Sequence, residues 1–458
     1  MITKNLNIRY LIAIYTCLLF TIQGTGQGTA TFTNWQQYTN SDDVGFSQEA
    51  LNTLQLKLEN TNTASLLVIY KGHVLFSYGD NTRKYMIHSI RKSIMNAMIG
   101  IEIENKVLKL EQTLAELNID DIGQLTPQEK KATLKDLLSA RSGIYHPSAY
   151  STRGMIKNLP QRGSHAPGSF WYYNNWDFNT LLSIYEQQTG KKFFEAFEQE
   201  IAKPIGMEDF KLKDTYYRLE QDKSKHPAYL FRMSARDMAR FGLLYLNNGA
   251  WKEKQIIPSQ WVKKSTQPVS TEIGNFTSRG AYGLLWWVSK FENKEVYYAS
   301  GLGGHRIMVF PNDDIVLVHR VNTYENKSVD LATMDDMVSQ LLKAKTEGDG
   351  NSDRPQLMPY QPKVTSGSTT FSGSMDQYLG TYRHRYLGEM TIKKENNGYI
   401  LQNAIGIFTL HPISENSFYP EDLQSRLIMK KASEGHLKFT IEPQMDENKS
   451  LTAVIFYY

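Results

Sequence analysis

Ser89 and Lys92 are the first two residues whose types and spacing suggest chemistry, because they form the only Ser-x-x-Lys pattern in the chain. On a helix, side chains three positions apart share one face, one turn from each other. A serine hydroxyl is a weak nucleophile until a base takes its proton, and a lysine amine is such a base only where burial lowers its pKa. Because roughly two such patterns are expected by chance in a chain of this length, a polar helix start with a solvated lysine is the alternative interpretation.

Tyr173 and Asn175 form a second candidate pair, in a Tyr-Asn-Asn segment that follows a loop signal at Pro167-Gly168. A tyrosine phenol can relay a proton between a serine and a leaving group, and an asparagine amide can bind a substrate carbonyl. Plain aromatic packing is the alternative, because four further aromatic side chains lie within residues 170–176.

Residues 300–305, Ser-Gly-Leu-Gly-Gly-His, form a third candidate segment. Gly303 and Gly304 carry no side chains and stand just before a predicted strand, so a substrate can lie against the backbone there. Taken alone, this segment indicates a glycine-rich turn.

The elements that must position these residues follow from the spacing of apolar side chains. In chain order, the sequence predicts a hairpin over residues 65–78, a buried helix over 89–106, a helix over 178–188 ending at Gly190, a helix opened by Ser234 with Asp237, and a hairpin of strands 306–310 and 315–321. Strands at both ends with helices between them predict an α/β fold, an α+β sandwich. We expect one antiparallel sheet, closed by the N- and C-terminal hairpins, and a helical lobe.

The end of the chain changes composition, which predicts a second domain. Residues 346–374 are rich in Gly, Ser, Thr, Pro and Asp, as a linker would be. Residues 375–458 contain short alternating segments of strand-forming residues and predict a separate small β-barrel or sandwich. The main domain is then expected over residues 28–345.

The start of the chain has the pattern of a secretory signal peptide, which we expect over residues 1–27. Lys4 and Arg9 precede an apolar stretch at residues 10–22, too short for the roughly 20 residues of a membrane span. We therefore expect an exported protein, periplasmic or secreted, without a membrane span after cleavage; an uncleaved anchor is the alternative. The only cysteine, Cys17, lies in this stretch, so disulfides, thiol catalysis and cysteine-bound zinc are excluded from the mature chain.

The charged residues and histidines of the chain indicate which kinds of partner to expect. The chain of 458 residues has 51 basic and 47 acidic side chains, dispersed along its length, and gives no indication of nucleic-acid binding. Its ten histidines include no His-Glu-x-x-His pattern, so we expect neither a metal nor another cofactor. The expected partner is a small-molecule ester, amide or peptide, and the sequence does not indicate an oligomeric state.

In this order and spacing, the three segments resemble the serine β-lactamase and penicillin-binding-protein superfamily, in particular its class C-like β-lactamase-related hydrolases. The resemblance covers residues 50–345 and includes the flanking phrases LKDLLSARSGI, YNNWDFNTLLSIYEQQTGKKF, SARDMARFGLLYLNNGAWKEKQIIPSQWV and YGLLWW. The final β module is similar to the lipocalin-like domains appended to some members of this group.

The resemblance implies an acyl-enzyme mechanism. Ser89 would attack a carbonyl carbon, and Lys92 with Tyr173 would accept the proton and pass it to the leaving group. The N–H groups of Ser89 and His305, which follows Gly303 and Gly304, would form the oxyanion hole. Asn175 would orient Lys92 and contact the substrate.

Two departures from the family pattern bear on the substrate. Leu302 stands where the family usually has Lys or His, a cation that commonly holds a substrate carboxylate, so neutral esters or amides are favoured. Arg91 is unusual between the serine and the lysine, and we expect it on the solvated face, although Arg91 or Arg306 could replace the missing cation. A β-lactamase or D,D-peptidase acting on cell-wall peptides is one alternative, and a non-catalytic penicillin-binding-like recognition protein is another.

Overall fold

The computed structural model describes residues 35–457, except 324–326, 347, 349, 353, 364–372, 385–387, 396–397, 404–405, 415–416, 421–424, 432–436 and 444–453. The predicted signal peptide, residues 1–27, lies outside the described residues.

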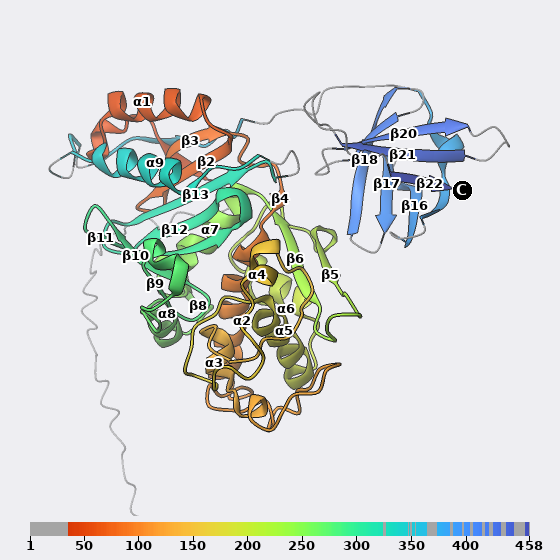
Figure 1. Ribbon diagram of the computed structural model, residues 1–458. Helices are drawn as coiled ribbons and strands as arrows, with labels where there is room; N and C mark the ends of the chain where they lie inside the picture. Colours follow the sequence, from red (N-terminus) through yellow and green to blue (C-terminus); the bar gives the residue numbers. More distant parts are fainter. Residues whose placement is uncertain are drawn as a thin grey trace, which may run out of the picture. The chain divides into compact units, whose positions relative to one another are not determined.

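One large mixed sheet forms the first layer of the fold (Figure 1). Within the described residues it has nine strands, in the order β14-β1-β3-β2-β13-β12-β11-β10-β9. Their bounds are Gln36–Tyr38 (β1), Thr63–Tyr70 (β2), His73–Gly79 (β3), Ala281–Tyr282 (β9), Trp287–Phe291 (β10), Lys294–Gly301 (β11), His305–Phe310 (β12), Ile315–Val321 (β13) and Leu357–Pro359 (β14). Neighbouring strands are antiparallel except β1 and β3, which are parallel.

Both predicted hairpins are confirmed, and β2 pairs with β13 to join them. They occupy the middle of the sheet, because β1 and β14 extend one edge while β9, β10 and β11 extend the other. Strand β14 lies inside the segment predicted as a linker, where Gln36 pairs with Pro359. The Pro and Gly content that indicated a linker is thus compatible with a short edge strand.

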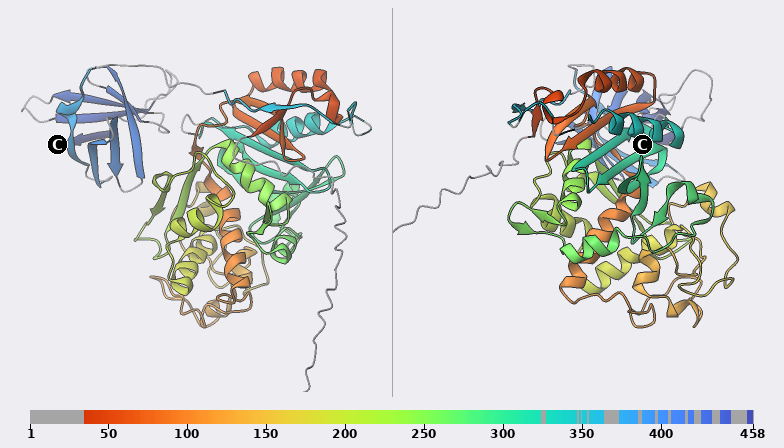
Figure 2. Two further views of the ribbon diagram at one scale, coloured as in Figure 1. Left: turned by 180° about the vertical axis from the view of Figure 1, so that it is seen from behind. Right: turned by 90° about the vertical axis from the view of Figure 1, so that its left-hand side faces the viewer.

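Helices cover both faces of this sheet (Figures 1 and 2). On one face lie α1 (Gln48–Glu59) and α9 (Leu331–Lys343), where Met337 contacts Thr63. On the other lies α7 (Ala235–Leu246), whose Gly242 comes so close to Val316 that an added Cβ would lie 2.5 Å from it. As predicted, Ser234 caps α7 by accepting a hydrogen bond from the Asp237 backbone N–H at 3.1 Å.

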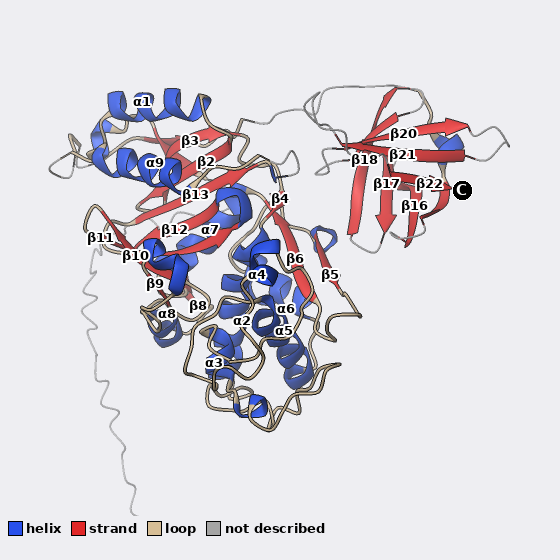
Figure 3. Cartoon of the chain, viewed as in Figure 1, coloured by secondary structure: helices blue, strands red, loops and turns tan. Residues whose placement is uncertain are grey.

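The helical lobe lies between the two hairpins in the chain, and Figure 3 shows α2 to α6 gathered together on one side of the large sheet. Its helices are α2 (Arg91–Glu104), α3 (Leu134–Leu138), α4 (Arg153–Lys157), α5 (Asn175–Thr189), α6 (Phe193–Phe197) and α8 (Ser259–Ser265). Short strands accompany them: β4 (Tyr85–Met86), β5 (Thr215–Arg218), β6 (Ala228–Met233), β7 (Ala250–Trp251) and β8 (Lys254–Gln255). The predicted helices over 89–106 and 178–188 correspond to α2 and α5, and α5 ends at Gly190 with a left-handed φ of 70°.

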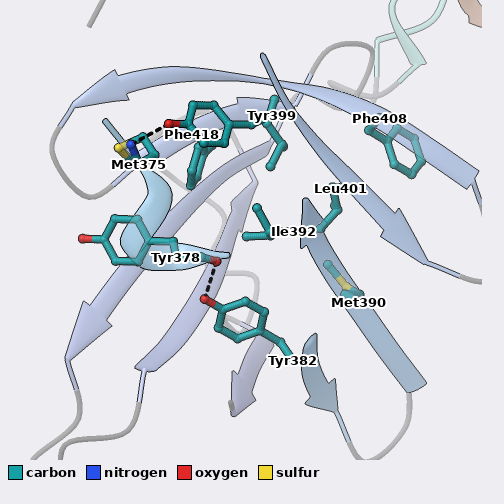
Figure 4. Close-up of a cluster of buried hydrophobic side chains, with 10 residues drawn as sticks. Met375, Tyr378, Tyr382, Met390, Ile392, Tyr399, Leu401, Phe408 and Phe418 are labelled. Atoms are coloured by element: carbon teal, nitrogen blue, oxygen red, sulfur yellow. Dashed lines mark hydrogen bonds between the residues drawn. The ribbon is translucent and has the colours of Figure 1, made fainter. Parts of the chain in front are cut away.

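Among its described residues, the C-terminal region is all β apart from one 3-10 turn, and it has its own core (Figure 4). Its strands are β15 (Gly380–His384), β16 (Gly388–Glu395), β17 (Gly398–Asn403), β18 (Gly406–Ser414), β19 (Ser417–Pro420), β20 (Ser425–Lys431), β21 (Leu437–Pro443) and β22 (Val454–Tyr457). They pair in chain order, and Arg383 of β15 pairs with Tyr457 of β22 to close the barrel. Apolar side chains fill it, and the Tyr382 hydroxyl donates to the Tyr378 carbonyl at 2.8 Å.

The predicted fold class is therefore confirmed, with two local differences. The strand-forming segments of this region predict strands over residues 378–382, 389–392, 398–402, 407–410, 437–441 and 453–457. The structure adds β19 and β20, and residues 376–378 form a 3-10 turn where the first of these strands was expected to begin. The alternating pattern is weak in β19 and β20 because Pro, Lys and Arg interrupt it.

Candidate active site

Ser89 lies in a 3-10 turn, His88–Ile90, that leads directly into α2. Most of α2 is buried on every side, since apolar residues surround its few polar ones. The turn follows the end of β4, and the Ile87 N–H between them donates to the Phe231 carbonyl of β6 at 3.0 Å. The nucleophile candidate is therefore held at the junction between the sheet and the helical lobe, half-buried.

Lys92 is placed as a base for Ser89. Its Nζ donates to Ser89 Oγ at 2.8 Å, and the side chain is only 2% exposed. The ammonium position lies 4.8 Å from the ring centroids of both Tyr173 and Phe178. Burial, and then the charge of Arg91, hold the pKa of Lys92 well below its ordinary value. The amine is thus driven toward the neutral form that can accept a proton.

Tyr173 joins the same group of side chains. It precedes α5, whose first turn is fixed by Asn174, which accepts a hydrogen bond from the Asp177 N–H at 2.9 Å. Burial raises the pKa of Tyr173, while a hydrogen bond with Ser89 and the charges of Arg91 and Arg279 oppose that shift. The phenol therefore keeps its proton at neutral pH and suits a relay, in which it gives one proton as it takes another.

Asn175 is buried at the start of α5, but its hydrogen bond goes elsewhere than the sequence suggested. Its Nδ2 donates to the Tyr150 carbonyl at 2.5 Å, and its Oδ1 is buried without a partner among the described residues. The expected contact with Lys92 is not one of its hydrogen bonds here.

The glycine segment contacts the nucleophile turn through Gly301, at the end of β11. A Cβ added to Gly301 would lie 2.6 Å from the Ile87 carbonyl oxygen, so only glycine allows this approach. Gly303 and Gly304 instead pack against Thr323 and Val329, with left-handed φ values of 83° and 106°. The close approach that brings this strand to Ser89 thus occurs two residues earlier than expected.

His305 is fully buried at the start of β12, so its imidazole does not line the cleft. Its Nδ1 accepts from Arg320 Nε at 3.0 Å, and burial with the nearby Arg320 charge holds its pKa well below the ordinary value. Its side chain is part of the core beneath the site.

Arg91 is also buried, which contradicts the expectation of a solvated face. Its guanidinium donates to Asn179 Oδ1 at 2.8 Å and lies 4.3 Å from the ring centroid of Tyr229. Since α2 is enclosed on all sides, a residue between Ser89 and Lys92 has no solvated face to occupy. Arg91 therefore cannot replace a cation at the substrate site.

Arg279 is a cation of this site that sequence reasoning missed. It donates to Ser300 Oγ at 3.1 Å and lies 5.1 Å from the ring centroid of Trp287, which stacks on Tyr173 at 5.7 Å. Arg306 donates to the same Ser300 oxygen at 2.6 Å, and burial together with Arg279 lowers its pKa to about 10. Arg279 belongs to no motif, so only the fold reveals it.

Exposed apolar side chains lie near the arginines of the site. Leu302 is 60% exposed, and Phe276 is exposed beside Arg279 and Trp287. The part of the chain that the structure describes contains no cluster of three or more His, Cys, Asp or Glu side chains arranged to hold a metal ion. In the same residues, no helix has the length and apolar character needed to span a membrane.

A buried lysine in contact with a half-buried serine and tyrosine, at the junction of an antiparallel-rich sheet and a helical lobe, defines the class: the site and fold are those of the β-lactamase and penicillin-binding-protein superfamily. The family model described as Beta-lactamase matches residues 54–338, which is more than half of the chain, so the chain belongs to that family.

Individual relatives are distant. An uncharacterized protein of Alkalihalophilus pseudofirmus is 20% identical over 312 residues, which cover 58% of this chain and 86% of that protein. The solved structure named "Putative 6-aminohexanoate-dimer hydrolase from Bacillus anthracis" is 23% identical, with a TM-score of 0.50, over 66% of this chain and 84% of that one. A structure of SurE is 14% identical, with a TM-score of 0.50, over 89% of this chain and 98% of that one. At these identities the two structures support the fold alone.

Proposed function

We propose that the protein hydrolyses a small ester or amide through an acyl-enzyme formed on Ser89. The observation that carries this proposal is the 2.8 Å hydrogen bond between Lys92 Nζ and Ser89 Oγ in a buried site that favours the neutral amine. Acyl transfer through a serine requires a base in contact with the hydroxyl, and Lys92 is in contact with Ser89.

The reaction proceeds in two halves. As Ser89 Oγ bonds to the substrate carbonyl carbon, its proton passes to Lys92 Nζ. The proton then moves, directly or through the Tyr173 hydroxyl, to the departing alcohol or amine as the bond to the leaving group breaks. A water attacks the acyl-serine ester by the reverse path, which releases the acid and restores the Ser89 hydroxyl.

The negative charge that develops on the carbonyl oxygen needs backbone donors. The Ser89 N–H, near the start of α2, is the first. The close approach of Gly301 to Ile87 favours the N–H of Leu302, the residue after Gly301, over that of His305 as the second.

A neutral substrate is favoured by the exposed Leu302, an apolar side chain directly after Gly301. The ring of Phe276 offers a second apolar contact at the rim. An apolar acyl or leaving group fits these side chains, because it removes their surface from water.

One observation favours the alternative, a β-lactamase or D,D-peptidase. Arg279 carries a half-exposed guanidinium beside Ser300 and near Tyr173, where a substrate carboxylate could bind. The non-catalytic alternative, a recognition protein, has less support. Burying a lysine against a serine hydroxyl, without a carboxylate to pair with it, costs free energy, and recognition alone gives no reason for that cost.

We further propose that the protein is exported by way of residues 1–27, whose pattern is that of a signal peptide.

The test compares three substrate classes on the same enzyme: p-nitrophenyl esters, D-amino-acid amides and nitrocefin, with Ser89→Ala as the control for background hydrolysis. Ester or neutral amide turnover well above nitrocefin turnover, and lost in Ser89→Ala, supports the proposal. Nitrocefin turnover equal to ester turnover, and lowered by Arg279→Gln, favours the β-lactamase alternative. Absence of turnover in all three classes, with no covalent labelling, favours the recognition protein.

A further inference from the structure

We propose that His88, the residue before the nucleophile, is a positioning residue whose side chain ties together the three segments of the active site. This inference rests on the proposed function, since it assigns a role in the acylation of Ser89. His88 touches neither the substrate nor the reacting atoms in this scheme.

The backbone of His88 requires such a tie. Its φ is 51°, in the left-handed region that residues with a Cβ rarely adopt. This conformation turns the chain between β4 and α2 and so sets the direction of the Ser89 hydroxyl. A strained conformation at this position persists only where surrounding contacts hold it.

The imidazole supplies those contacts on both sides. Nδ1 is hydrogen-bonded with the Tyr150 hydroxyl at 2.7 Å, and Nε2 with the Thr323 hydroxyl at 2.8 Å. Burial, followed by the charges of Arg320 and Lys92, lowers the pKa of His88 to about 3. A neutral imidazole donates through one nitrogen and accepts through the other, and each hydroxyl can serve in either role.

Each partner leads to another segment of the site. The Tyr150 carbonyl accepts from Asn175 Nδ2 at 2.5 Å, and the Tyr150 N–H donates to Glu220 at 3.1 Å, so Tyr150 links His88 to the start of α5. Thr323 packs its methyl group against Gly303 of the glycine segment. The imidazole therefore connects the Ser89 turn to both the Tyr-Asn-Asn segment and the glycine segment.

This arrangement predicts a loss of rate rather than of affinity when the ties are removed. A nucleophile displaced by a fraction of an ångström binds substrate as before but attacks it more slowly, and displacement of about 1 Å can cost about 100-fold. Tyr150→Phe and Thr323→Val each remove one hydroxyl and leave Ser89, Lys92 and Tyr173 in place.

The test measures kcat and KM, and the rate of labelling by a fluorophosphonate, for Tyr150→Phe, Thr323→Val and the double variant. The matched control is Tyr145→Phe, which removes another tyrosine–histidine hydrogen bond, the 3.1 Å contact of Tyr145 with His165, from the same loop. We expect each single variant to lower kcat and the labelling rate by roughly 10- to 100-fold, with KM within a few-fold of wild type and the control close to wild type.

Rescue at position 88 gives a second readout. Asparagine tolerates the left-handed conformation and places an amide near the position of Nδ1. His88→Asn should therefore keep more activity than His88→Ala. Adding Thr323→Val to His88→Asn should lower the activity little further, because the amide replaces the nitrogen that faces Tyr150 and not the one that faces Thr323. If His88→Ala does not fold, the hydroxyl variants still decide the matter.

The outcomes separate this inference from the proposed function. Wild-type labelling that disappears in Ser89→Ala, combined with unchanged rates in Tyr150→Phe and Thr323→Val, overturns the role of His88 alone. If Ser89→Ala is labelled as fast as the wild-type protein, the proposed function itself is overturned.

Discussion

Replacing Lys92 with methionine tests the assignment of the base. Methionine has nearly the same length and fits between the rings of Tyr173 and Phe178, so the packing survives and only the amine is lost. We expect the rate of Ser89 acylation to fall by about 10²- to 10⁴-fold, the usual contribution of a positioned general base.

The structure shows why the effect should be this large. In water, a lysine of ordinary pKa is neutral in roughly one molecule in 2,500 at pH 7, which would make it a poor base. Burial of Lys92 at 2% exposure, with Arg91 nearby, moves its pKa well below that value. Each unit by which burial lowers the pKa of a lysine raises the fraction of neutral amine at neutral pH about tenfold, until the pKa reaches the working pH.

The assay is the time course of fluorophosphonate labelling at neutral pH, followed by intact mass, with thermal unfolding measured in parallel. Lys92→Arg is the companion variant, because a guanidinium remains protonated and cannot accept the proton. Both variants should fold, and Lys92→Met should be at least as stable as wild type, since a buried amine is exchanged for an apolar side chain. Labelling of Lys92→Met within tenfold of wild type would refute the assignment.

Two further predictions concern the surroundings of the site. Gly301→Ala should lower the labelling rate by roughly 10- to 100-fold, because the new Cβ would meet the Ile87 carbonyl at 2.6 Å. The control Gly154→Ala, whose new Cβ would have no neighbour closer than 3.9 Å, should label at the wild-type rate. Equal labelling rates for the two variants would count against the approach of β11 to Ser89. Burial raises the pKa of Asp177 to about 8, against about 3.9 in the unfolded chain, so wild-type stability should fall as pH rises from about 4 to 8, by up to about 6 kcal/mol. Asp177→Asn should show a smaller fall in melting temperature over this range, and an identical pH profile would contradict the shift.

Local patterns carried most of the fold prediction. The two hairpins, α2, α5 and α7 follow from apolar spacing and from end signals such as Ser234 and Gly190, which act within one element. The Ser-x-x-Lys and Tyr-Asn-Asn segments identified the right side chains because one turn of helix fixes Ser89 against Lys92, whatever the rest of the fold does.

What the sequence could not predict depends on contacts between distant segments. The burial of Arg91 depends on the lobe around α2, and the approach of Gly301, rather than Gly303, depends on how β11 meets Ile87. Arg279, at the end of a 3-10 turn, and Tyr150, in a loop, enter the site from segments that carry no motif. Strand β14 forms only because β1 offers it an edge, which no local pattern in residues 346–374 reveals.

The covalent adduct itself tests the central claim most directly. Wild-type protein and Ser89→Ala are treated with a fluorophosphonate, and the site of the adduct is mapped by peptide mass spectrometry. We expect one adduct per chain, on the peptide that contains Ser89, and none on the variant. An adduct on another residue, or equal labelling of both proteins, would contradict the account.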